Sequence, residues 1–70
     1  MNENKEKFYQ ELENELPLME KTAKGMPKVK QGNVLNYIGS LKMVLRLPLS
    51  QRLLERDQLI VSAVKEILNP

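Results

Sequence analysis

The sequence predicts an all-α fold: a small three-helix bundle, with a kinked first helix and a hairpin of the second and third, completed by self-association. Apolar residues recur at intervals of three and four, the period of one helix face, and no segment has the pattern of a strand. Two breaks that contain proline, 25–32 and 47–50, divide the chain into three such segments. The 70 residues form one helical domain, 1–70, of a size that buries only about 60% of its unfolded surface.

The first helix is predicted over residues 4–24. Its apolar stripe, with Tyr9 beside it, has spacings of four, four, three and four: Phe8, Leu12, Leu16, Met19 and Ala23. Pro17 falls on the face opposite the stripe, which keeps its phase across the proline, so we expect one bent, continuous helix with the proline toward solvent. The alternative is two helices that separate at residues 15–16, because a residue before proline avoids the α conformation.

A basic connector is predicted over 25–32, since Gly25 and Pro27 are residues that commonly end a helix. The second helix is predicted over 33–46, with Asn33 as its N-cap. Its apolar residues repeat at spacings of four, three and four, the pattern of a coiled-coil seam: Val34, Ile38, Leu41 and Leu45.

The turn over 47–50 precedes a third helix predicted over 51–68. Ser50 is a suitable N-cap, and Leu49 and Leu54 have the spacing of a hydrophobic staple. Because the turn is short, the second and third helices are expected to form a hairpin or to cross steeply.

The third helix has more apolar surface than two neighbouring helices can easily cover. Nine of its residues are apolar: Leu53, Leu54, Leu59, Ile60, Val61, Ala63, Val64, Ile67 and Leu68. On a helical wheel they span about 220°, whereas a surface helix needs a stripe of little more than 100°. The excess predicts a homo-oligomer, with a dimer as the expected state, or an unidentified protein partner. The alternative is a monomer in which the other two helices clasp the third. The predicted contact residues are Met43, Leu47, Leu59, Ile60 and Ala63.

Asp57 lies in the middle of this apolar face. A buried carboxylate must pair or take up a proton, and Lys42, Arg46 or the hydroxyl of Tyr37 on the second helix could reach it. One hypothesis makes Asp57 a buried polar specifier that fixes the register of pairing. The alternative places it near a solvated end of the bundle.

Charge is distributed unevenly along the chain, whose net charge is +2. The first twenty residues carry −4, residues 21–54 carry +7 with no acidic residue, and residues 55–70 carry −1. The basic middle implies an anionic partner, which could be the acidic first helix, a second copy or a nucleic acid. A helix-turn-helix-like or phosphate-contacting protein is therefore the alternative function. Its predicted contacts are Lys28, Lys30, Lys42 and Arg46.

Several classes of function are disfavoured by composition. The chain has no cysteine and no histidine, so disulfides, the preferred zinc ligands and Ser–His or Cys–His dyads are absent. Its three glycines are isolated, and no phosphate-binding loop is present. We therefore predict no catalytic residue, cofactor or metal. The polar N-terminus and short apolar runs predict a cytoplasmic protein with no membrane contact. The predicted function is that of a small, non-enzymatic interaction or regulatory protein.

Overall fold

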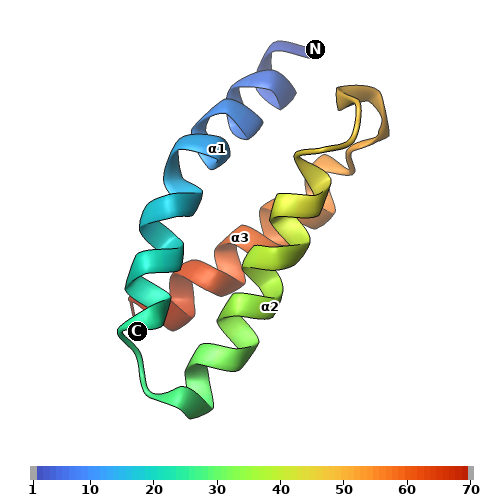
Figure 1. Cartoon of the computed structure of the whole chain (residues 1–70). Coiled ribbons are helices and arrows are strands. Elements are labelled where there is room, and N and C mark those ends of the chain that lie inside the picture. Colours follow the sequence, from blue (N-terminus) through green and yellow to red (C-terminus); the bar gives the residue numbers. More distant parts are fainter. Residues whose placement is uncertain (1, 70) are drawn as a thin grey trace.

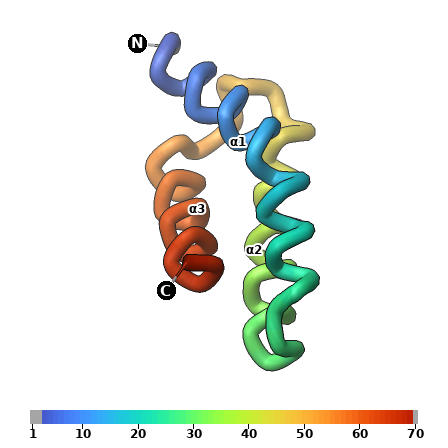
Figure 2. Tube along the Cα trace, turned by 90° about the vertical axis from the view of Figure 1, so that its left-hand side faces the viewer, coloured from blue at the N-terminus to red at the C-terminus, as the bar shows by residue number. Residues whose placement is uncertain are grey.

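Three α-helices follow one another in the computed structural model, which describes residues 2–69: α1 (Asn2–Lys24), α2 (Lys28–Val44) and α3 (Leu54–Leu68). A short 3-10 helix, η1 (Leu49–Gln51), precedes α3. None of these residues forms a strand, so the predicted all-α class is confirmed. The chain reverses direction from α1 to α2 and again from α2 to α3 (Figures 1 and 2). Within this described part, no helix combines the length and apolar character needed to cross a bilayer.

α1 is one continuous helix that runs through Pro17. The proline is exposed, as expected from its position opposite the apolar stripe. A proline costs least where its ring faces solvent and the packed side of the helix is undisturbed. The alternative of two helices that separate at residues 15–16 is therefore wrong.

The core is formed by one apolar stripe from each helix. Its buried apolar members are Tyr9, Leu12, Leu16, Met19, Ala23, Val34, Ile38, Leu41, Val44, Val61 and Val64. Two details differ from the sequence prediction. Tyr9 occupies the core position that was assigned to Phe8, which is only half-buried and packs edge-on against the Tyr9 ring. Likewise Val44 is buried, whereas Leu45 is half-buried.

α2 begins five residues earlier than predicted, so the basic connector over 25–32 is wrong. The backbone N–H groups of Lys30 and Gln31 donate to the carbonyl of Pro27 at 3.1 and 3.0 Å, which places the helix start directly after the proline. Proline suits this position because its fixed φ is helical and its missing N–H needs no partner there. Asn33 is consequently an exposed residue inside α2 rather than its N-cap.

The side chain of Gln31 holds the end of α1 against the start of α2. Its amide nitrogen donates to the carbonyls of Lys24 at 2.8 Å and Ala23 at 3.3 Å. The last carbonyls of a helix have no partner within the helix, so these bonds satisfy two of them. Gly25 follows α1 without a left-handed φ.

The connection from α2 to α3 is longer than the predicted turn. α2 ends at Val44, and α3 starts at Leu54, three residues after the predicted start. The Gln51 N–H donates to the Pro48 carbonyl at 2.9 Å and closes η1, and the next two residues are extended. Ser50 therefore lies within η1 and does not cap α3.

Candidate protein interface

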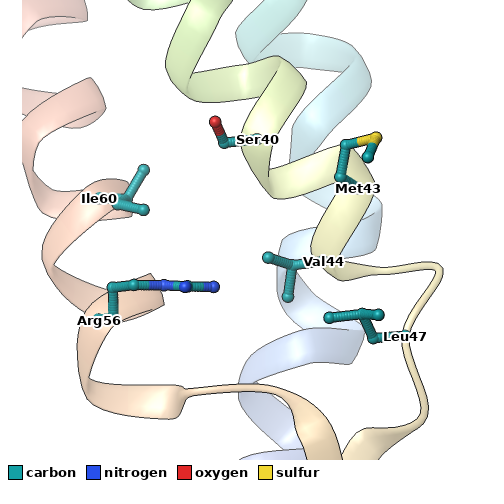
Figure 3. Close-up of a pocket in the computed structure, with 6 residues that line it drawn as sticks. All are labelled: Ser40, Met43, Val44, Leu47, Arg56 and Ile60. Atoms are coloured by element: carbon teal, nitrogen blue, oxygen red, sulfur yellow. The ribbon is translucent and has the colours of Figure 1, made fainter.

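An apolar groove of about 480 Å³ lies between α2 and α3 (Figure 3). Four of its six lining side chains are apolar. The six lining residues come from α2, from the segment just after it and from α3: Ser40, Met43, Val44, Leu47, Arg56 and Ile60. Figure 3 shows the Arg56 side chain extending from α3 toward the α2 wall. The groove is therefore an apolar depression with one cationic group at its edge.

All five predicted contact residues lie on α2, α3 or the segment between them. Met43, Leu47 and Ile60 line the groove, and Met43 and Leu47 are 64% and 38% exposed. Leu59 and Ala63 are not among the lining residues. Because they are one position before and three positions after Ile60, they occupy the adjacent edge of α3. Leu59 is 73% exposed and Ala63 is half-buried.

The exposure of Leu59 follows from which side of α3 the core uses. The buried positions of α3 are Asp57, Val61 and Val64. At about 100° per residue, Leu59 lies about 140–160° away from each of them. α1 and α2 together cover only part of the apolar arc, as the sequence predicts, and the Leu59 edge is left to solvent.

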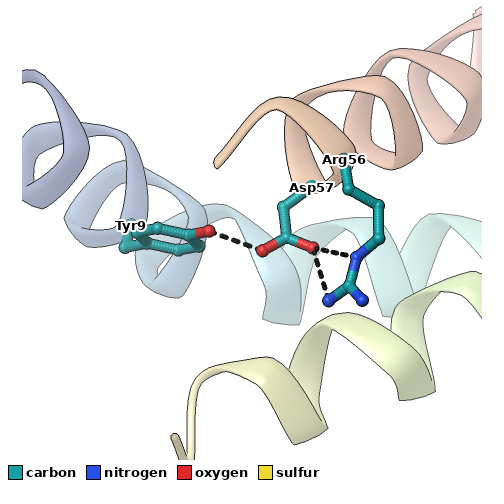
Figure 4. A network of polar contacts seen from close by, with 3 residues as sticks. All are labelled: Tyr9, Arg56 and Asp57. Carbon is teal, nitrogen blue, oxygen red and sulfur yellow. Dashed lines mark hydrogen bonds and ion pairs between the residues drawn. The ribbon is translucent and has the colours of Figure 1, made fainter. Parts of the chain in front are cut away.

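Asp57 is completely buried, and its carboxylate is paired (Figure 4). The Tyr9 hydroxyl, from α1, donates to Oδ2 at 2.5 Å, and Arg56 donates to Oδ1 through Nε and Nη2, both at 3.3 Å. Among the described side chains, no buried nitrogen or oxygen lacks a hydrogen-bond partner. The alternative in which Asp57 lies near a solvated end is therefore wrong.

This pairing also perturbs Tyr9. Burial raises the pKa of the Tyr9 phenol well above its usual value, and the hydrogen bond to the Asp57 carboxylate raises it further. The phenol therefore stays protonated, and remains a donor, further into the alkaline range than an exposed tyrosine. A buried hydroxyl beside a buried carboxylate satisfies both groups, which explains why a tyrosine rather than a phenylalanine can occupy this core position.

None of the three predicted partners of Asp57 reaches it. Lys42 instead pairs with Glu20 of α1, and that hydrogen bond lowers the pKa of the Glu20 carboxyl. Tyr37 and Arg46 are exposed. The sequence prediction failed because it considered only the second helix as the neighbour of Asp57, whereas this side of α3 also faces α1.

Arg52 belongs to the basic middle segment, and its structural role was not predicted: it joins three parts of the fold. Nη2 donates to the Leu45 carbonyl at 2.9 Å and Nε to the Leu47 carbonyl at 3.0 Å. The guanidinium carbon lies 4.9 Å from the centroid of the Tyr9 ring, a cation–π contact with α1. The one available signal was the need for donors of the carbonyls at and just after the end of α2, which a cation shortly after the helix can supply.

The predicted nucleic-acid contacts do not form one patch. Lys28 and Lys30 lie in the first turn of α2, whereas Lys42 lies in its last turn and Arg46 follows its end. A helix of 17 residues is about 25 Å long, so the two pairs are far apart. Lys42 is moreover engaged by Glu20, which is the intramolecular pairing of basic middle and acidic helix that the sequence left open.

Comparisons of the chain with protein-family models, with curated proteins and with solved structures find no match. No relative's activity can therefore be transferred to it. Its function is therefore inferred from its own surface, on which the α2–α3 groove and the Leu59 edge together form an exposed apolar region.

Proposed function

We propose that the protein is a small, non-enzymatic interaction protein that acts through a docking surface on α2 and α3, and that this surface associates with a second copy of the chain. The docking surface consists of the groove and the adjacent edge of α3: Met43, Leu47, Leu59, Ile60 and Ala63. The observation that carries the proposal is the 73% exposure of Leu59 beside an apolar groove.

The energetic argument compares this surface with the stability of the fold. Burying a leucine or methionine side chain is worth about 1.5–3 kcal/mol relative to leaving it in water. A domain of this length has a total stability of roughly 3–10 kcal/mol. Covering the exposed parts of Met43 and Leu59 would therefore contribute about 2–4 kcal/mol, a substantial fraction of that stability. Small domains without disulfides or metals commonly gain stability by association, and this chain has no cysteine for a disulfide.

Sedimentation of the purified chain at low and high concentration tests the proposal. We expect a concentration-dependent dimer for the native chain. Leu59→Lys should yield a monomer with an unchanged helical circular-dichroism spectrum, because the substituted side chain contributes little to the core. Leu18→Lys is the matched control, since Leu18 is 67% exposed but lies on α1. It should leave the dimer intact.

Two outcomes contradict the proposal. One is a native chain that stays monomeric at the highest concentration reached. The other is a dimer that Leu59→Lys leaves intact, because association would then use another surface.

A further inference from the structure

The outer side of α3 carries four residues at spacings of three, four and three, which is the a–d repeat of a coiled-coil seam. They are Arg56, Leu59, Ala63 and Glu66. At about 100° per residue they span about 80° of the helix surface, so they form one narrow stripe. Leu59 and Glu66 are exposed, Ala63 is half-buried, and the Arg56 side chain is about half exposed. The fold therefore leaves this seam without a partner helix among the described residues.

The order of the residues along the stripe is basic, large apolar, small apolar, acidic. Reading the helix in the opposite direction exchanges the two charges and exchanges the large side chain with the small one. If two copies of α3 lie antiparallel with their outer sides in contact and their midpoints at the level of residue 61, Arg56 of each meets Glu66 of the other. By the same symmetry, Leu59 of each meets Ala63 of the other. The stripe is thus self-complementary in both charge and volume in the antiparallel orientation.

From this pattern, and given the proposed function, we infer that the chain dimerises through an antiparallel α3–α3 pair about a two-fold axis that crosses the outer side of α3 midway between Leu59 and Ala63. A two-fold interface requires that residue i meets residue j and residue j meets residue i, which the two pairs satisfy. A parallel pair would place Arg56 against Arg56 and Glu66 against Glu66. It would also place Leu59 against Leu59 and leave a gap between the two Ala63 residues. Like charges in contact disfavour that arrangement.

The buried network fixes the Arg56 guanidinium at the edge of the groove, next to the seam. Arg56 donates to Asp57 Oδ1 through Nε and Nη2, and Asp57 is fixed from the other side by Tyr9. A guanidinium has five N–H donors, so others remain for Glu66 of the second copy. Asp57 thereby orients a cation at the interface, which is how a buried carboxylate can specify the register of pairing.

Cysteine cross-linking tests the orientation, because the native chain contains no cysteine and each introduced thiol is the only one in its chain. A tagged Ala63→Cys chain is mixed with an untagged Leu59→Cys chain and oxidised. We expect the cross-linked heterodimer to predominate over both cross-linked homodimers. Predominance of the homodimers would overturn the antiparallel pairing and indicate a parallel one.

Charge reversal is an independent test that leaves Leu59 and Ala63 in place. Glu66→Arg alone and Arg56→Glu alone should each lose the dimer at a concentration where the native chain is dimeric. The double variant Arg56→Glu/Glu66→Arg should recover part of the dimer, and so should an equal mixture of the two single variants; because Arg56→Glu also removes a hydrogen-bond partner of Asp57, circular dichroism of each variant verifies that it is folded. Dimers that persist in all single variants would overturn the inferred pairing while leaving the proposed function standing. A monomeric native chain would remove both.

Discussion

The two sides of α3 differ in how completely the fold uses them. On the inner side Val61 and Val64 are buried in the core, and the one charged residue, Asp57, has both carboxylate oxygens bonded. On the outer side Leu59 remains in water although it is as apolar as the core residues. Both sides belong to one helix with one continuous apolar arc. The difference shows that two neighbouring helices cover only the inner part of the arc, which stabilises the fold, while the outer part stays exposed and is the part that we propose for association.

The largest expected effect comes from placing the same charge on each side of α3. Val64→Asp should abolish folding, because an unpaired buried carboxylate costs several kcal/mol, which is comparable to the whole stability of such a small domain. Leu59→Asp should remain folded, since its position is largely exposed. Thermal unfolding followed by circular dichroism distinguishes the two. Comparable destabilisation by both substitutions would remove the distinction between the two sides.

Removal of the Tyr9 hydroxyl should have the next largest effect. Tyr9→Phe leaves the buried Asp57 carboxylate without its shortest hydrogen bond, and bonds to charged groups contribute about 1.5–3 kcal/mol. The free energy of unfolding, measured by urea titration, should fall by that amount. Tyr37→Phe is the matched control: its ring is partly exposed, and we expect a change within about 0.5 kcal/mol. Equal effects from the two tyrosines would show that the Tyr9–Asp57 bond adds no stability.

Replacement of Asp57 by leucine separates stability from specificity. Asp57→Leu leaves the buried Tyr9 hydroxyl without a hydrogen-bond acceptor, at a cost of about 1–3 kcal/mol. Because the substitution also removes a buried charge, we expect a smaller loss of stability than in Tyr9→Phe. Because Arg56 loses the carboxylate that orients it, the cross-linking preference between positions 59 and 63 should weaken. An unchanged mass together with an unchanged cross-linking pattern would exclude a role for Asp57 in the pairing register.

Stability should also fall in alkaline solution. The pKa of Tyr9 is raised in the folded state, so above the unfolded value of about 10 the unfolded chain loses this proton while the folded chain keeps it. The stabilisation that comes from the protonated Tyr9 phenol is complete below pH ~10. Above that pH the free energy of unfolding falls by up to about 1.4 kcal/mol per pH unit. Urea titrations of the native chain and Tyr9→Phe should therefore converge as the pH rises above 10. Parallel curves would indicate that Tyr9 titrates normally.

The smallest effect concerns the basic start of α2. Lysines at a helix N-terminus oppose the helix dipole, and an acidic residue there typically stabilises by about 0.3–1 kcal/mol. Lys28→Glu should thus raise the unfolding free energy modestly and leave the dimer unchanged, because Lys28 lies outside the docking surface.

Mixed-sequence duplex DNA, titrated at several salt concentrations, tests the remaining alternative, a nucleic-acid-binding function. Steeply salt-dependent binding that Lys28→Glu weakens would favour a nucleic-acid partner instead.

Much of the fold could be predicted from residue spacing because helix periodicity is a local property. The continuity of α1 through Pro17 followed from the phase of its stripe, and the central place of Asp57 followed from the wheel position. The first residues of α2 and α3 were predicted less well. The sequence predicts breaks at Pro27 and Pro48, whereas each proline comes directly before a helical turn. A proline signals both the end of one helix and the first turn of the next, and spacing alone does not separate the two.

By itself the sequence determined that the protein is helical, that its third helix is over-supplied with apolar residues and that one carboxylate lies among them, since each follows from residue order along a single helix. Only the tertiary structure decided that Tyr9, 48 residues away, pairs with Asp57, that Arg52 binds the carbonyls just after α2, and that Leu59 stays largely exposed. Those outcomes depend on how α1 and α2 are placed around α3, and that placement arises from packing between segments distant in sequence.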